Sequence, residues 1–158
     1  MSCKLDIVVS VDVSGSLNYS GNSAISQAQN AFVVSLINDF SVGMNAGLYQ
    51  FGISRWGSGL AVNDQCGGRW LTDNPADAIV TANAITGTGG TDFVVGLNIG
   101  YDGLNKAQTD TANCSLGDRT GDVQFKRVLI FITDAGAPVD PVETALAESM
   151  WVDTDIYC

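Results

Sequence analysis

The side chains best suited to chemistry lie close to the start of the chain. Asp12, Ser14 and Ser16 are spaced two residues apart and follow an apolar run that begins at Leu5. One carboxylate and two hydroxyls in so short a segment offer the oxygen ligands that a hard divalent cation prefers. Asp and Ser also cap ordinary strand-to-helix turns, so these three residues alone fit either a cation site or a simple turn.

Two later segments supply further oxygen atoms. Residues 86–92, TGTGGTD, form the most glycine-dense part of the chain and carry Thr91, and a second apolar run, 127–133, leads directly to Asp134. A glycine-rich loop bends tightly and turns its N–H and hydroxyl groups toward one point. Together with the first turn, these segments provide carboxylates from two strand ends and hydroxyls from two loops. Asp92 stands where a dinucleotide-binding loop needs its third glycine, which argues against that function.

The composition excludes several classes of function. The 158 residues suit a single domain, 1–158, that buries its own core. Histidine is absent, which removes Ser-His-Asp and Cys-His catalysis and histidine-bound zinc, so a metal must be held by oxygen or sulfur. The net charge is −10, from seven basic and 17 acidic residues, and no basic cluster is present to neutralise a nucleic acid or an anionic membrane. No apolar run is long enough to span a membrane.

The cysteines and the N-terminus bear on the cellular compartment. The four cysteines are Cys3, Cys66, Cys114 and Cys158. They are too scattered for a CxxC motif and are either buried thiols or disulfides, with a Cys3–Cys114 bond as one option. Asp6 interrupts the first apolar run, and no signal peptide is visible. We expect an intracellular protein, or an extracellular or virion-surface protein if the chain is a piece of a longer one.

Apolar patterning predicts five strands. They cover 5–12, 46–53, 59–62, 127–133 and the start of a last strand at 152–158. The first and fourth are nearly continuous runs of branched apolar residues, which is typical of strands that are covered on both faces. The second and third are so close in sequence that they should form an antiparallel hairpin.

Helical periodicity predicts four helices between these strands. They cover 25–40, 75–85, 93–104 and 142–150, and glycines weaken the propensity of the third. Pro75 suits the first position of the second helix. The buried face of the first helix is expected to carry Ile25, Ala28, Phe32, Leu36 and Phe40.

The alternation of strands and helices predicts the fold class and the place of the site. We expect an α/β, Rossmann-like, three-layer sandwich with a mainly parallel central sheet and one antiparallel edge strand. Asp12 and Asp134 would then stand at the carboxyl ends of two strands near the middle of the sheet. Open α/β sheets bind their ligands at this edge.

Three motifs in this order resemble the von Willebrand factor A domain family, which includes the integrin inserted domains. DVSGS at 12–16 fits the first part of the family's metal ion-dependent adhesion site (MIDAS). GGT at 89–91, followed by Gly96-Leu97, resembles the family's threonine loop and the start of the helix after it. ITDAG at 132–136 resembles the third part, with Ala135 where glycine is more usual. Each motif is weak alone, but their order and spacing agree over nearly the whole chain.

The resemblance implies a Mg²⁺ site, with Mn²⁺ or Ca²⁺ as substitutes. Ser14, Ser16 and Thr91 would coordinate the ion directly, and Asp12 and Asp134 would do so directly or through water. In the family, a carboxylate from a partner protein completes such a site. The resemblance therefore implies a non-catalytic, cation-dependent protein-binding or adhesion module, with no enzymatic activity.

One departure from the family and two alternatives remain open. The chain ends at Cys158, inside the expected fifth strand, so we expect either a fragment lacking the family's last strand and helix or a partner chain along the exposed sheet edge. The first alternative is a Mg²⁺-dependent phosphoryl-transfer enzyme resembling the haloacid dehalogenases, although Ser14 stands where those enzymes carry a second aspartate. The other alternative is a structural component of a larger surface or virion assembly.

Overall fold

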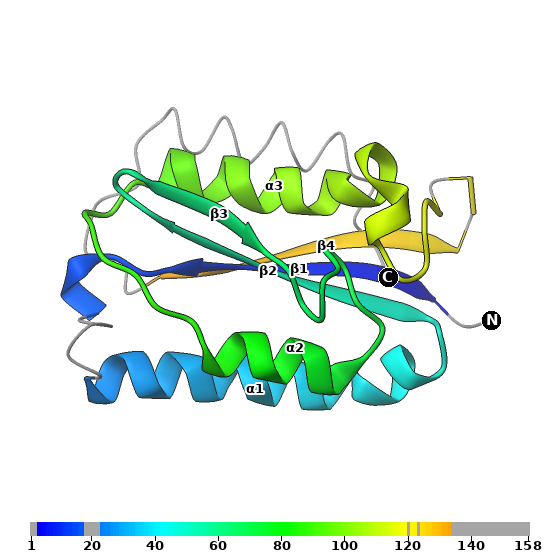
Figure 1. Cartoon of the computed structure of the whole chain (residues 1–158), viewed down its shortest axis with the longest axis horizontal. Helices are drawn as coiled ribbons and strands as arrows, with labels where there is room; N and C mark the ends of the chain where they lie inside the picture. Colours follow the sequence, from blue (N-terminus) through cyan, green and yellow to red (C-terminus); the bar gives the residue numbers. More distant parts are fainter. Residues whose placement is uncertain (1–2, 18–22, 120, 123, 134–158) are drawn as a thin grey trace.

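A four-stranded sheet is the central layer of the chain (Figure 1), whose computed structural model describes residues 3–17, 23–119, 121–122 and 124–133. The strands are β1 (Lys4–Asp12), β2 (Tyr49–Gly57), β3 (Leu60–Asp64) and β4 (Phe125–Ile132), in the order β3-β2-β1-β4. β1 pairs in parallel with both β2 and β4, and β3 runs antiparallel to β2 at an edge. The mainly parallel sheet with one antiparallel edge strand is therefore confirmed. The expectations for Asp134 and for segments 142–150 and 152–158 lie outside the described residues.

Helices cover both faces of this sheet, which makes three layers (Figure 1). α1 (Ala24–Asn45) and α2 (Pro75–Asn83) lie side by side on one face, and α3 (Phe93–Thr109) lies on the other. Two short 3₁₀ helices complete the described elements, η1 (Gly15–Leu17) and η3 (Thr111–Asn113). Within the described part of the chain, no helix combines the length and apolar character needed to cross a membrane.

Local sequence explains where the three long helices begin. Ser23 caps α1 by accepting a hydrogen bond from the amide of Ser26, and Asn74 caps α2 in the same way before Pro75. Asp92 caps α3 through the amide of Val95, at 3.1 Å. Each capping side chain satisfies an amide that has no partner inside its helix.

The glycines of α3 allow this helix to lie close to the sheet. A Cβ at Gly96 would stand 2.5 Å from the Trp56 ring, and one at Gly100 would stand 2.6 Å from a methyl carbon of Leu129. Larger side chains would push the helix away from the sheet. Close packing thus compensates for the weak helix propensity of this segment, and α3 extends five residues beyond the predicted end at Leu104, to Thr109.

The buried face of α1 agrees only in part with the prediction, because Leu36 and Phe40 pack against the core whereas Ala28 is exposed. Ile25 and Phe32 are 57% and 50% exposed, whereas Val33 and Ile37 are fully buried. The buried residues of α1 are Ser26, Gln29, Val33, Ile37, Gly43 and Met44. Apolar residues cover much of this helix, so more than one set of positions fits helical periodicity. The set that faces the sheet includes two polar residues, Ser26 and Gln29, and both side chains are hydrogen-bonded.

β2 begins and ends later in the chain than predicted. Gly47 has φ +66° and turns the chain after α1, so that the strand begins at Tyr49. The strand then continues through Trp56, and the hairpin turns at Ser58–Gly59, where Gly59 has φ +82°. This shift places Trp56 beside Asp12 in the strand register.

The proposed Cys3–Cys114 disulfide is wrong. Cys66 and Cys114 are both buried free thiols. Burial disfavours the charged thiolate and raises the pKa of each thiol to about 11. Cys114 follows η3, and its side chain belongs to a small apolar cluster with Leu71 and Leu104.

Candidate functional site

Asp12 lies at the carboxyl end of β1, as predicted, and its side chain is completely buried. One carboxylate oxygen, Oδ1, accepts a hydrogen bond from the amide of Ser14 at 2.8 Å. The other, Oδ2, accepts one from the hydroxyl of Thr133 at 2.8 Å. The side-chain amide of Gln29 donates to the Asp12 carbonyl at 2.9 Å, which ties the end of β1 to α1. The carboxylate is therefore held from two sides by neutral donors.

The two serines of the first turn lie beside this carboxylate. Ser14 is buried and Ser16, in η1, is exposed, and their hydroxyl oxygens are 3.0 Å apart. The hydrogen bond from the Ser14 amide to Asp12 folds the turn back toward the strand end. The structure thus brings these three predicted residues together at the carboxyl edge of the sheet.

The glycine loop 86–92 is fastened to its neighbours at three carbonyl oxygens. Arg55 donates to the carbonyl of Thr86 at 2.6 Å. The amide of Gly15 donates to the carbonyl of Gly89 at 2.6 Å, and the amide of Ser58 donates to the carbonyl of Gly90 at 2.5 Å. These bonds join the loop to β2, to the first turn and to the β2–β3 turn.

Glycine is required at two positions of this loop. A Cβ at Gly87 would stand 2.3 Å from a Val13 side-chain carbon, and Gly89 has φ +127° with the Ser58 carbonyl 2.6 Å from where its Cβ would be. Thr91, half-buried, follows directly after these anchored residues. The loop that carries Thr91 therefore contacts the turn that carries Ser14 and Ser16, as the sequence predicted.

Two further acids, Asp92 and Asp134, belong to the segments near this edge of the sheet. Asp92, which follows Thr91 in the chain, caps α3. Asp134 lies outside the described residues, but Thr133, its neighbour in the chain, reaches Asp12. The end of β4 therefore adjoins the end of β1, in agreement with the parallel register of these strands.

No described cationic side chain forms an ion pair with Asp12. All seven Lys and Arg residues of the chain belong to the described part. The acidic partners in their ion pairs are Asp122, Asp64, Asp102 and Asp6. A buried carboxylate is normally paired with a cation or bound to a metal. Asp12 is thus a buried acid whose described partners are only hydrogen-bond donors.

Three aromatic rings pack directly beneath this edge. Trp56 stacks on Phe131, with ring centroids 4.9 Å apart, and meets Phe93 edge-on at 5.8 Å. The three rings come from β2, α3 and β4, so they fix the ends of these elements relative to one another. The indole N–H of Trp56 is buried and donates to no acceptor within the described part of the chain.

Sequence reasoning missed two residues that contact Asp12. Gln29 was missed because the predicted buried stripe of α1 did not include it, and a single glutamine in a helix gives no local signal that its side chain will be buried. Thr133 was read only as the end of an apolar strand. Its position immediately before Asp134 was a signal, because the residue before a strand-end acid lies at the same edge of the sheet.

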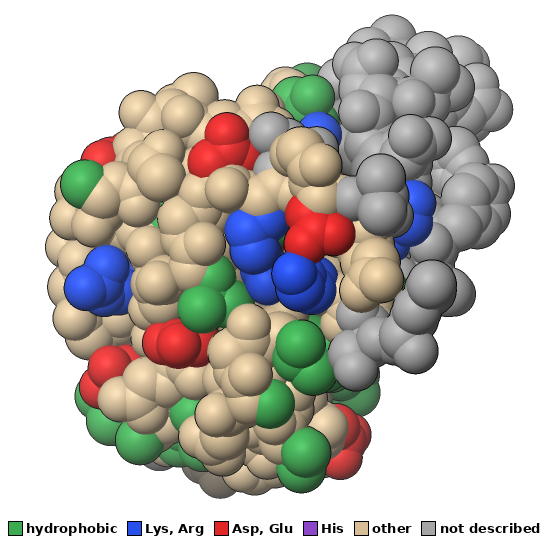
Figure 2. Space-filling view, turned by 90° about the vertical axis from the view of Figure 1, so that its right-hand side faces the viewer, with side chains coloured by type: hydrophobic (Ala, Val, Ile, Leu, Met, Phe, Trp, Pro, Cys, Tyr) green, Lys and Arg blue, Asp and Glu red, His purple; other side chains and the backbone are tan. Residues whose placement is uncertain are grey.

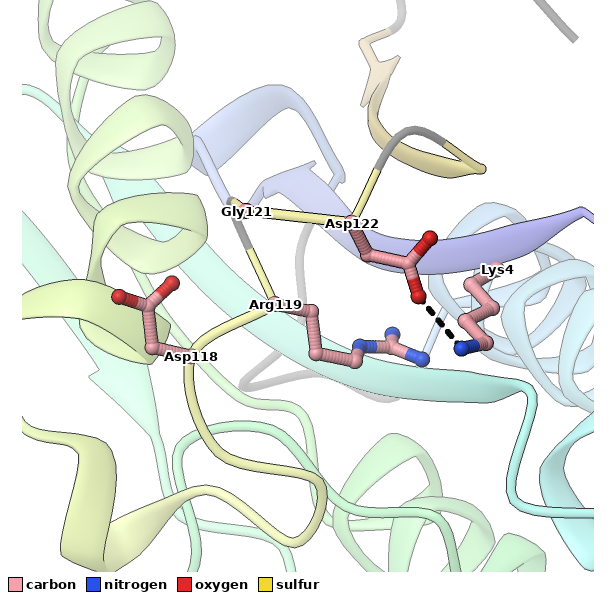
Figure 3. A pocket seen from close by; sticks show the side chains of 5 residues that line it. All are labelled: Lys4, Asp118, Arg119, Gly121 and Asp122. Atoms are coloured by element: carbon pink, nitrogen blue, oxygen red, sulfur yellow. Dashed lines mark hydrogen bonds and ion pairs between the residues drawn. The ribbon is translucent and has the colours of Figure 1, made fainter.

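A hollow of about 590 Å³ lies at the opposite, amino-terminal edge of the sheet (Figure 3). Its lining residues are Lys4, Asp118, Arg119, Gly121 and Asp122. Lys4 pairs with Asp122 at 2.5 Å, and Arg119 pairs with the buried Asp6. Basic and acidic side chains also lie side by side on this face in Figure 2. The charges here are matched, unlike the charge of Asp12.

Comparison with known proteins finds the same fold in several solved structures. The sequence matches no protein-family profile and no curated protein. The proximal thread matrix protein 1 of the mussel byssus is similar over 96% of this chain, with a TM-score of 0.67 and 18% identity. The vWF domain of the type V pili tip protein Mfa5 from Porphyromonas gingivalis is similar over 92%, with a TM-score of 0.58 and 19% identity. The pilus adhesin SpaC from Lactobacillus rhamnosus GG, in an open conformation, is similar over 85%, with a TM-score of 0.58 and 21% identity.

These likenesses concern the fold of one part of each larger protein. This chain spans 36% of the byssus protein chain, 44% of the Mfa5 chain and 15% of the SpaC chain. The fold is that of a von Willebrand factor A-like, Rossmann-like α/β domain, as the resemblance of the three motifs implied.

Proposed function

We propose that the carboxyl edge of the sheet binds a divalent cation and that the chain acts as a non-catalytic, cation-dependent protein-binding module. The observation that carries the proposal is the burial of Asp12 without a cationic partner among the described residues. A divalent cation would neutralise this carboxylate where the lysines and arginines do not.

The donor set fits Mg²⁺, with Mn²⁺ or Ca²⁺ as substitutes. Neighbouring ligands of an octahedral Mg²⁺ ion are about 3 Å apart, given metal–oxygen distances of about 2.1 Å. The hydroxyl oxygens of Ser14 and Ser16 have this separation, at 3.0 Å. Each oxygen of Asp12 accepts one hydrogen bond from the described residues, which leaves a lone pair for the ion or its water. Thr91 and Asp134 would complete the ligands from the protein.

The bound cation would supply open coordination positions for a ligand from another protein. A carboxylate is the fitting ligand, because Mg²⁺ prefers hard, negatively charged oxygen. Adhesion or surface assembly is the role that we assign to such binding. The proteins with similar structures include a pilus adhesin, a pilus tip protein and a byssal thread matrix protein, and none of the three is named as an enzyme. These names support the proposed role.

Calorimetry on the purified chain tests this proposal. We expect Mg²⁺ and Mn²⁺ to bind the unaltered chain and binding to be lost in Asp12→Ala. Asp39→Ala is the matched control, because it removes the same charge from an exposed position on α1. Equal affinity of the unaltered chain and Asp12→Ala, or no binding to either, would contradict the proposal.

A further inference from the structure

Thr133 lies within the ITDAG segment, where the sequence predicts no role for it, and in the structure it contacts Asp12. Its hydroxyl donates to Oδ2 of Asp12 at 2.8 Å, across 121 residues of sequence. Thr133 directly follows β4, in which Ile132 pairs with Val11 of β1, so the two side chains meet at the next step of the register. The acceptor is completely buried.

We propose that Thr133 is a positioning residue that fixes the Asp12 carboxylate in the orientation needed for cation binding. This inference rests on the cation site proposed above. Thr133 acts through Asp12 and is assigned no contact with the ion. The residues that support a ligand in this way usually hold its plane and its free lone pairs in place.

The two hydrogen bonds on Asp12 explain why this residue needs Thr133. The amide of Ser14 belongs to the same turn as Asp12 and holds Oδ1 only. A carboxylate held at one oxygen can still rotate about its last side-chain bond, because that torsion is broad. The Thr133 hydroxyl holds the second oxygen from the residue that follows β4, so the carboxylate plane is fixed by contacts from the ends of two different strands.

The same contact joins the two strand ends that carry the acids of the proposed site. A shift of the end of β4 relative to β1 would change the hydrogen bond from Thr133 and with it the orientation of Asp12. The Trp56–Phe131 stack, whose centroids are 4.9 Å apart, opposes such a shift because Phe131 lies two residues before Thr133. The position of Thr133, which the register of β4 against β1 sets, thus determines the orientation of the Asp12 carboxylate.

A purely structural role for Thr133 makes a different prediction. If the hydroxyl only satisfies a buried carboxylate, its removal would lower the free energy of unfolding of the metal-free chain without changing the affinity of the folded chain for a cation. Cation affinity and metal-free stability therefore have to be measured on the same variants.

The experiment compares Thr133→Val with Thr133→Ser. Valine keeps the shape of threonine without the hydroxyl, and serine keeps the hydroxyl. We expect Thr133→Val to bind Mn²⁺ about 10- to 100-fold more weakly by calorimetry and Thr133→Ser to restore most of the affinity. Thr109→Val is the matched control, because the Thr109 hydroxyl donates to the carbonyl of Asn105 within α3, at 3.0 Å, far in the sequence from the turn that carries Asp12. Urea unfolding with a chelator present gives the metal-free stability.

The outcomes separate this inference from the proposed function. Mn²⁺ binding by the unaltered chain, with the same affinity in Thr133→Val, would overturn the role of Thr133 and leave the cation site standing. A folded Thr133→Ser as weak as Thr133→Val would also overturn it. Absence of Mn²⁺ binding to the unaltered chain would overturn both proposals. If near-ultraviolet circular dichroism shows that Thr133→Val is unfolded, Thr133→Ala replaces it as the variant without a hydroxyl.

Discussion

Two aspartates of the same strand, Asp6 and Asp12, are buried to the same degree and are treated differently by the fold. Both are completely buried in β1, at its amino-terminal half and its carboxyl end. Arg119 forms an ion pair with Asp6, Gln50 donates to the same carboxylate at 2.8 Å, and Arg127 is near enough to act on its charge. Asp12 has only neutral donors among the described residues.

The difference supports a structural role for the amino end of the strand and the cation site proposed above for its carboxyl end. At the amino end the protein itself supplies the opposite charge, and Arg119 also donates to the carbonyls of Leu48 and Leu5, so the pair ties the segment after η3 to the sheet. At the carboxyl end the protein supplies a fastened loop, hydroxyls and an uncompensated carboxylate. A site that is neutralised only by an external cation is typical of metal binding. The following predictions test this comparison.

Removal of the Arg119 side chain should change the free energy of unfolding more than any other substitution proposed here. Arg119→Met leaves the buried charge of Asp6 without its partner, and we expect a loss of about 3–5 kcal/mol in the free energy of unfolding. Urea unfolding at neutral pH measures it. Lys4→Met is the matched control, because it removes a cation whose pair with Asp122 is about one-third exposed to solvent, and its effect should be much smaller.

The double variant Asp6→Asn/Arg119→Met checks the reason for that loss. It removes both charges, so it should be more stable than Arg119→Met alone. A double variant no more stable than Arg119→Met would show that the lost packing of Arg119, and not the stranded charge of Asp6, causes the destabilisation.

Asp12→Asn should raise the free energy of unfolding in the absence of metal, whereas Arg119→Met lowers it. Asparagine keeps an acceptor for the amide of Ser14 and places an N–H group near the Thr133 oxygen, and it removes a charge that no described cation compensates. We expect a gain of about 0.5–2 kcal/mol in the free energy of unfolding with a chelator present, as is common when a functional charge is removed. The gain should vanish when Mg²⁺ is added, because only the unaltered chain binds it. Destabilisation in the chelator would show that the ionised carboxylate is structurally required, as at Asp6.

The raised pKa of Asp6 should make the free energy of unfolding depend on pH, and this is the smallest of the expected effects. Burial raises the pKa of Asp6 above its ordinary value of 3.8, despite the opposing influence of Arg119. The folded chain then keeps a proton that the unfolded chain has already lost, so the contribution of Asp6 to stability falls as the pH rises from about 3.8 through the raised pKa.

Urea unfolding between pH 3.5 and 7 measures this contribution as the difference between the unaltered chain and Asp6→Asn. The difference is needed because Asp110 and Asp122 titrate in the opposite sense. Hydrogen bonds from Trp70 and Lys4 lower the pKa of Asp110 and Asp122, respectively, and their contribution is lost as the pH falls. A difference that rises with pH would contradict the role assigned to burial at Asp6.

Local patterns in the sequence predicted much of the fold. Continuous branched apolar residues predicted β1 and β4, the short spacing predicted the β2–β3 hairpin, and Pro75 marked the start of α2. These signals depend on residues near one another in the chain, so they are readable without the tertiary structure. The errors were at α1, where several apolar stripes compete, and at β2, where the turn at Gly47 displaced the strand.

The candidate site also combines features that the local sequence predicts with contacts that only the tertiary structure shows. By itself the sequence determined that Asp12, Ser14 and Ser16 share one turn after a buried strand, that Thr91 follows a glycine loop, and that histidine chemistry is absent, because residue type and short spacing are local properties. Only the tertiary structure decided that Arg119 neutralises Asp6 across 113 residues and that Thr133 holds Asp12 across 121. Such partners are selected by strand register and helix packing, which depend on the whole chain, and so the tertiary structure determines which of the two buried aspartates has a cationic partner among the described residues.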